Sequence, residues 1–172
     1  MPSELDLKYD AVLAAVTGPG GRLIIGRNDE GRAIVTNFPA TLPVFFDIFC
    51  ALNGAVEGVV CGEERLTYAE LNAHATRLAH ALVGRGIAKG DRVAIAMRNC
   101  PAWIAAYMAV LKSGAIATLV NGWWQPDELA HGLRLTEPKL VIADRARAAK
   151  IEATGLALDI VPIDVEKHLG EA

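Results

Sequence analysis

The sequence predicts an α/β fold, a partial doubly wound and largely parallel sheet with flanking helices, preceded by short N-terminal β-hairpins. The main observation is that short apolar strands alternate with helices from Arg92 to the last strand. Composition agrees, since 52% of the 172 residues are hydrophobic and 22% are charged, which excludes intrinsic disorder. A chain of this length also buries enough apolar surface to fold with no disulfide or metal.

The first region, residues 1–55, is predicted to be irregular, with a short hairpin and helical segments. A helix over Leu5–Val16 is followed by a glycine-rich stretch that stops it. Arg22–Gly26 and Arg32–Thr36 flank turn residues and are predicted to be two strands. Apolar residues at helical spacing then predict a second helix over 41–52.

The second region, residues 56–172, is predicted to begin with a hairpin formed by Val56–Cys61 and Arg65–Leu66. Thr67 and Glu70 have the spacing of a capping box, in which each side chain accepts from the other residue's amide. An apolar stripe follows, so a helix is expected from Tyr68 to the glycines near residue 84.

Strands and helices then alternate. The expected strands are Arg92–Met97, Ala115–Val120, Lys139–Ala143 and Ile160–Ile163. The expected helices are Pro101–Lys112, Pro126–Leu135 and Arg145–Ala153, the last capped by Asp144. This order predicts right-handed βαβ units.

Charge and composition exclude several classes of protein. With 17 basic and 20 acidic residues the net charge is −3, which argues against a dedicated nucleic-acid binder. No apolar run approaches the roughly 20 residues of a membrane span. The segment that starts at Met1 has no basic stretch followed by an apolar run, so we expect no secretory signal there. Cys50, Cys61 and Cys100 form no C-x-x-C pair, so we expect buried, reduced thiols in a cytoplasmic protein.

Motifs for catalysis or metal binding are not found, and we assign no catalytic or metal-ligating residue. The glycines of residues 84–90 follow a helix and precede a strand, the reverse of a dinucleotide-binding loop. The glycines of residues 18–21 lack the lysine of a P-loop. The four histidines have no ligand-spaced companions.

A tandem pair, Trp123 and Trp124, follows the end of a predicted strand. Loops beyond the carboxyl ends of parallel strands are where α/β proteins bind ligands. The pair is therefore a candidate wall for an apolar substrate pocket. The alternative is that one ring fills the core and the other covers the loop.

Four segments together resemble adenylate-forming enzymes, the superfamily of acyl-CoA synthetases and AMP-binding enzymes. They are L-T-Y-A-E-L at 66–71, G-I-A-K-G-D-R-V-A-I at 86–95, R-N-C-P-A-W at 98–103 and A-V-L-K-S-G-A at 109–115. The order and spacing make the joint match specific over roughly residues 56–154. The segment at 120–129 resembles the branch that acts on fatty or other apolar carboxylic acids, with Gly122 where that branch commonly has proline.

The resemblance implies the N-terminal subdomain of an ATP-dependent acyl-CoA synthetase, truncated before the family's ATP phosphate loop. In that family, a carboxylate attacks ATP to give an acyl-adenylate, and coenzyme A then displaces AMP, with Mg²⁺ assisting. The implied partners are the remaining subdomains, a small carboxylic acid and, through an uncovered apolar face, a second copy. The chain alone is expected to bind no cofactor and to be inactive.

The resemblance also suggests a coenzyme A phosphate contact, formed by Arg145, Arg147 and Lys150 near the start of a helix. Arginine's planar fork suits phosphate geometry. The alternative is a solvated helix face with acidic neighbours. For the whole chain, two other functions stay open: a stand-alone interaction module without activity, or part of a peptide-synthetase adenylation domain or a luciferase-like enzyme.

Overall fold

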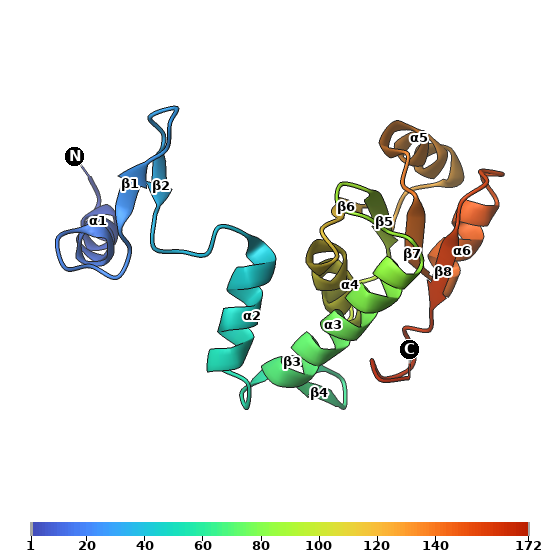
Figure 1. The fold of residues 1–172 in the computed structure, drawn as a ribbon, viewed down its shortest axis with the longest axis horizontal. Helices are drawn as coiled ribbons and strands as arrows, with labels where there is room; N and C mark the ends of the chain where they lie inside the picture. The colour runs from blue at the N-terminus through green and yellow to red at the C-terminus, as the bar shows by residue number, and fades with distance from the viewer. Residues whose placement is uncertain (1, 172) are drawn as a thin grey trace. The chain divides into compact units, whose positions relative to one another are not determined.

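The computed structural model describes residues 2–171, and the chain forms two compact units, residues 1–45 and 46–172 (Figure 1). Their boundary lies inside helix α2 (Leu42–Leu52). The division expected at residue 55 stays a prediction about domain organisation.

The first unit contains helix α1 (Glu4–Thr17) and an antiparallel pair, β1 (Ile25–Arg27) and β2 (Ala33–Val35). The β1 strand starts later than its sequence predicts. The cause is Asn37, whose side chain accepts from the Ile24 N–H and donates to the Arg22 carbonyl, both at 2.9 Å. These bonds take the place of strand pairing at the Ile24 N–H and the Arg22 carbonyl, while the Ile24 carbonyl still accepts from the Thr36 N–H at 2.8 Å.

The second unit opens with an antiparallel hairpin, β3 (Glu57–Cys61) and β4 (Glu64–Thr67). Helix α3 (Tyr68–Gly84) follows, and the predicted capping box is present. The Glu70 N–H donates to the Thr67 hydroxyl at 3.2 Å, and the Thr67 N–H donates to the Glu70 carboxylate at 2.9 Å. The Thr67 amide and, second, the Thr67 hydroxyl donate to the Glu70 carboxylate and hold the pKa of Glu70 below its ordinary value.

Removing this cap should weaken the fold without touching any proposed ligand contact. Thr67→Ala deletes the acceptor of an otherwise unpaired helix amide, so we expect a loss of about 1 kcal/mol in the free energy of unfolding. Urea denaturation followed by circular dichroism measures the effect. An unchanged midpoint would show that the cap contributes nothing.

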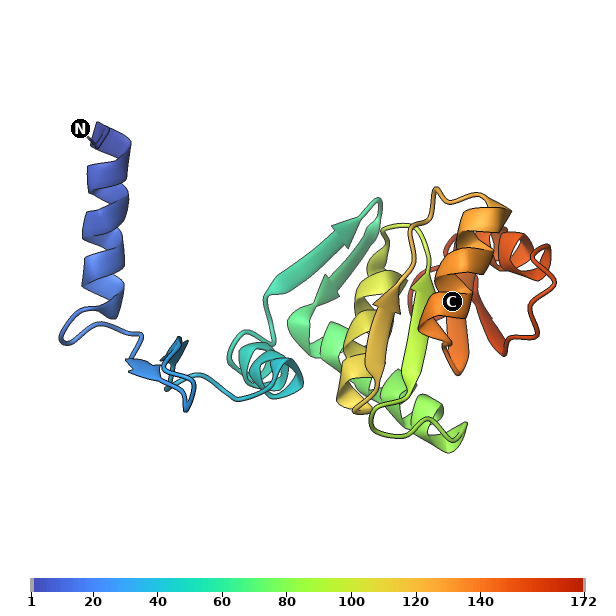
Figure 2. The same cartoon turned by 90° about the horizontal axis from the view of Figure 1, so that it is seen from above.

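The main sheet is fully parallel, with strand order β6-β5-β7-β8 (Figure 2). Its strands are β5 (Arg92–Ala96), β6 (Ile116–Leu119), β7 (Leu140–Asp144) and β8 (Ile160–Ile163). The chain runs from β5 to β6 on one side and then crosses to β7 on the other side of β5. The order therefore reverses at β5, as in doubly wound folds.

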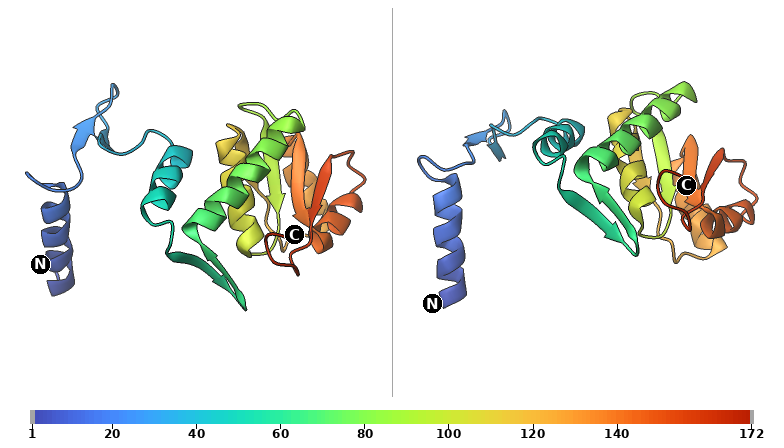
Figure 3. Two further views of the ribbon diagram at one scale, coloured as in Figure 1. Left: turned by 60° about the horizontal axis from the view of Figure 1, so that its bottom comes forward. Right: turned by 90° about the horizontal axis from the view of Figure 1, so that it is seen from below.

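Helices cover both faces of this sheet, and Figure 3 shows α3 lying across one of them. The first face packs on α3 and α4 (Pro101–Lys112), around Ile95, Leu82 and Ile142. The second face packs on α5 (Pro126–Thr136) and α6 (Arg145–Glu152), around Leu129 and Ile151. Successive β5 residues face opposite layers, which explains the unbroken apolar strand sequence. The predicted α/β fold is confirmed.

The cysteines agree in part with expectation. All three are free, with Cys50 buried and Cys100 half-buried, but Cys61 is exposed because it lies at the end of β3. Within residues 2–171, no helix is both long and apolar enough to cross a bilayer.

Candidate functional site

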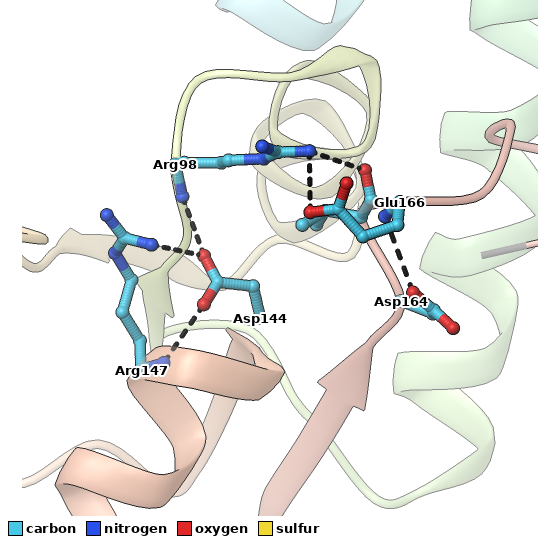
Figure 4. A network of polar contacts seen from close by, with 6 residues as sticks. Arg98, Asp144, Arg147, Asp164 and Glu166 are labelled. Atoms are coloured by element: carbon cyan, nitrogen blue, oxygen red, sulfur yellow. Dashed lines mark hydrogen bonds and ion pairs between the residues drawn. The ribbon is translucent and has the colours of Figure 1, made fainter.

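The candidate site lies at the carboxyl ends of the parallel strands, where β5 and β7 are neighbours and the strand order reverses. This position is where open α/β sheets bind ligands, because the loops that leave adjacent strands diverge there. Charged side chains from three such loops converge on it (Figure 4). They belong to the segments after β5, β7 and β8.

Asp144 is the centre of the site. It is 2% exposed and ends β7 as the N-cap of α6. One carboxylate oxygen accepts from the Arg147 N–H at 2.9 Å. The other accepts from the Arg98 N–H at 2.9 Å and from Arg147 Nη1 at 2.6 Å (Figure 4). A buried carboxylate is tolerated when it is paired and hydrogen-bonded in this way.

Two further arginines are paired with acids from the segment after β8. Arg98 Nη2 contacts Glu166 at 3.0 Å and donates to the Val165 carbonyl at 3.0 Å. Arg145 contacts Asp164 at 3.1 Å. These groups line a cavity of about 280 Å³, in which each arginine has an acidic partner. The ion pairs of this network therefore hold the three loops together. An anion could bind one of these arginines only by displacing its acidic partner.

The three predicted phosphate-binding cations occupy different environments. Arg145 is exposed, at 77% of its side chain, so its guanidinium can reach a ligand. Arg147 is largely buried and bound to Asp144. Lys150 lies in the last turn of α6, half-buried and without an ion pair among the described residues. The structure brings Arg145 and Arg147 to the same edge and leaves Lys150 farther along the helix.

The two tryptophans also separate. Trp123 is 85% exposed, and its backbone N–H donates to the side-chain oxygen of Asn121 at 3.0 Å. Trp124 packs on the α5/α6 core and lies so close to Gly132 that a methyl group there would be 2.6 Å from its ring. Trp123 is therefore available for a ligand, while Trp124 supports the loop.

A second cavity, of about 360 Å³, lies between the β3–β4 hairpin and the start of α4. It is lined mainly by apolar groups and by Cys61 and Cys100. Burial raises the pKa of the Cys100 thiol, so this sulfur stays protonated and is a poor nucleophile. Within residues 2–171, no group of three or more histidine, cysteine or acidic side chains is placed to hold a metal ion.

Sequence reasoning treated Asp144 as a cap and Arg98 as part of a motif, and it missed their meeting at this site. One local signal was available, because Asp144 is the last residue of the buried strand β7 and Arg98 lies two residues after the largely buried strand β5. Parallel strands place such residues at one edge of a sheet. Their pairing, 46 residues apart, needed the strand order.

A family model described as "AMP-binding enzyme" matches residues 47–170, which include the whole sheet and its carboxyl edge. The chain belongs to the AMP-binding enzyme family. The resemblance seen in its four sequence segments is thus confirmed.

Relatives of this AMP-binding chain include two kinds of enzyme. It is 38% identical over 104 residues to the medium/long-chain-fatty-acid–CoA ligase FadD6 of Mycobacterium tuberculosis, covering 60% of this chain and 17% of the ligase. It is 32% identical over 127 residues to the probable non-canonical nonribosomal peptide synthetase CymA of Salinispora arenicola, covering 74% of this chain and 2% of the synthetase. The chain therefore spans a small part of each relative.

Solved structures agree on the fold. The N-terminal domain of FACL13 from Mycobacterium tuberculosis superposes with a TM-score of 0.68 and 28% identity, over 74% of this chain and 35% of that one. A benzoate CoA ligase from Burkholderia xenovorans gives a TM-score of 0.69 at 19% identity, over 75% of this chain and 27% of that one. The α/β unit has the fold of the N-terminal part of such enzymes.

Proposed function

We propose that this chain is the N-terminal subdomain of an ATP-dependent acyl-CoA synthetase that acts on a long-chain fatty acid or another apolar carboxylic acid. The observation that carries the proposal is the 38% identity, over 104 residues, to a medium/long-chain-fatty-acid–CoA ligase. The reaction joins the acid to ATP as an acyl-adenylate with release of pyrophosphate. The thiol of coenzyme A then displaces AMP.

The residues present suit one part of this chemistry. We assign ATP and its metal to the remaining subdomains, as the family resemblance implies. The carboxyl edge of the sheet instead offers guanidinium groups, which match phosphate oxygens in shape and charge. We assign the coenzyme A phosphate contact to Arg145 and Lys150, with Arg147 beside them.

The acyl side of the proposal rests on Trp123. Its exposed ring stands on the loop after β6, and a large flat apolar surface suits a fatty acyl chain or an aromatic acid. Trp124 holds that loop against α5. We further propose that the enzyme is cytoplasmic, that its partners are its own remaining subdomains and that it forms a homodimer.

Charge removal at Arg145 tests the phosphate contact in the complete enzyme. Arg145→Gln should raise the apparent KM for coenzyme A about tenfold, as expected for one lost charge-assisted contact, and leave ATP–pyrophosphate exchange unchanged. Lys150→Gln should act in the same direction, while Lys8→Gln, on helix α1 of the other compact unit, serves as the control. An unchanged KM in both site variants would contradict the assignment.

A second function is favoured by the peptide-synthetase relative, because its match covers more of the chain. Product analysis of the complete enzyme separates the two. The ligase predicts a fatty acyl-CoA product that requires coenzyme A. An adenylation domain predicts amino-acid-dependent exchange with no acyl-CoA, and an interaction module predicts neither.

A further inference from the structure

Gly122, in the loop from β6 to α5, lies against Arg147, the largely buried arginine of the site. A methyl group built on Gly122 would collide with Arg147, nearest to Nε and at 2.7 Å from Nη2 and 3.0 Å from Cζ. Arg147 Nε is buried and has no hydrogen-bond partner in the described structure. One edge of the guanidinium is thus packed against the glycine, while Nη1 donates to Asp144.

Arg147 cannot move aside without cost. Its guanidinium is held at 2.6 Å by Asp144, a carboxylate that is 2% exposed and is itself fixed by the amides of Arg98 and Arg147. Displacing the side chain would leave that carboxylate buried beside fewer donors, which is unfavourable. A larger residue at position 122 must therefore displace the loop, the arginine, or both.

We propose that Arg147 is a positioning residue that anchors the loop of residues 121–124 to the carboxyl end of β7, and that Gly122 makes room for it. The contact joins the loops after β6 and β7 across the intervening strand β5. It sets where Trp123 stands relative to Arg145. The meaning of that distance for acyl and coenzyme A binding rests on the proposed function, but the anchor itself does not.

This role gives the departure from the fatty-acid branch a physical reason. Proline at position 122 would carry the same Cβ that collides with Arg147. In this chain the missing side chain of Gly122 therefore leaves the space that the Arg147 guanidinium occupies. Arg147 is largely buried and paired with Asp144, which holds it against the loop. Arg145, in the same turn of α6, is the arginine that faces solvent.

A double-mutant cycle on the chain itself tests the anchor. Gly122→Ala should lower the folded-to-unfolded equilibrium constant about tenfold, within the range expected for overpacking, and it should shift the ¹⁹F signals of Trp123 and Trp124 in 5-fluorotryptophan-labelled protein. In an Arg147→Ala background, Gly122→Ala should lower the folded-to-unfolded equilibrium constant less than about threefold and should leave the two ¹⁹F signals unshifted. Gly84→Ala is the matched control, since a methyl group there meets no atom within 4 Å.

The outcomes are separable from those of the activity proposal, because no ligand is used. If Arg147→Ala alone unfolds the chain, the cycle is run on Asp144→Asn/Arg147→Ala, which removes the buried charge together with its partner. Equal effects of Gly122→Ala with and without Arg147 would overturn the anchor. So would unchanged tryptophan signals in Gly122→Ala.

Discussion

Asp144→Ala should lower the free energy of unfolding by about 3–5 kcal/mol, the usual cost of removing one partner from a buried ion pair. The substitution leaves the largely buried Arg147 guanidinium without its carboxylate. It also removes the cap of α6 and the acceptor for the Arg98 amide, which links β5 to β7. Three buried or half-buried donors thus lose one acceptor group at once.

Denaturation in urea measures this loss, and two variants make the comparison specific. Asp144→Asn keeps an oxygen for capping and removes the charge, so its loss should fall between the wild type and Asp144→Ala. Asp127→Ala removes an exposed acid at the start of α5 and should change stability by about 0.5 kcal/mol or less. A loss below about 1 kcal/mol for Asp144→Ala would show that the network is not structurally important.

Local chemistry allowed most elements to be predicted from sequence. The α3 cap depends on Thr67 and Glu70, three residues apart, and α4 begins at Pro101, so their starts can be read from short segments. The N-terminal strand was misplaced because Asn37 bonds the backbone at Ile24, 13 residues earlier. Such a bond carries no periodic signal.

The site shows the same limit more strongly. The sequence indicates which residues lie at strand ends. The partners of Asp144, however, depend on β5 lying next to β7, and that strand order is set by the packing of many residues together. The collision of Gly122 with Arg147 likewise spans two loops. Residue type gave the candidates Arg145 and Trp123, and the fold determined that these two face solvent while Arg147 and Trp124 pack inward.

The polypeptide of residues 1–172 alone should be silent in ATP–pyrophosphate exchange with any fatty acid, while folding cooperatively. A phosphate cradle needs several amides and a lysine that converge at the start of a helix. The glycines at 84–90 instead end α3 and lead into β5, and Gly86 and Gly90 have positive φ in two successive turns. No described group of acids is placed for a metal either.

The exchange assay is made decisive by measuring folding and activity on the same preparation. Circular dichroism should show a cooperative transition, because the sheet has a buried core on both faces. The complete enzyme, assayed in parallel, should exchange pyrophosphate in the presence of a fatty acid. Exchange above background by a folded preparation, whose mass shows that it ends at Ala172, would mean that these residues carry a phosphate site of their own. That result would overturn the assignment of ATP chemistry to the remaining subdomains.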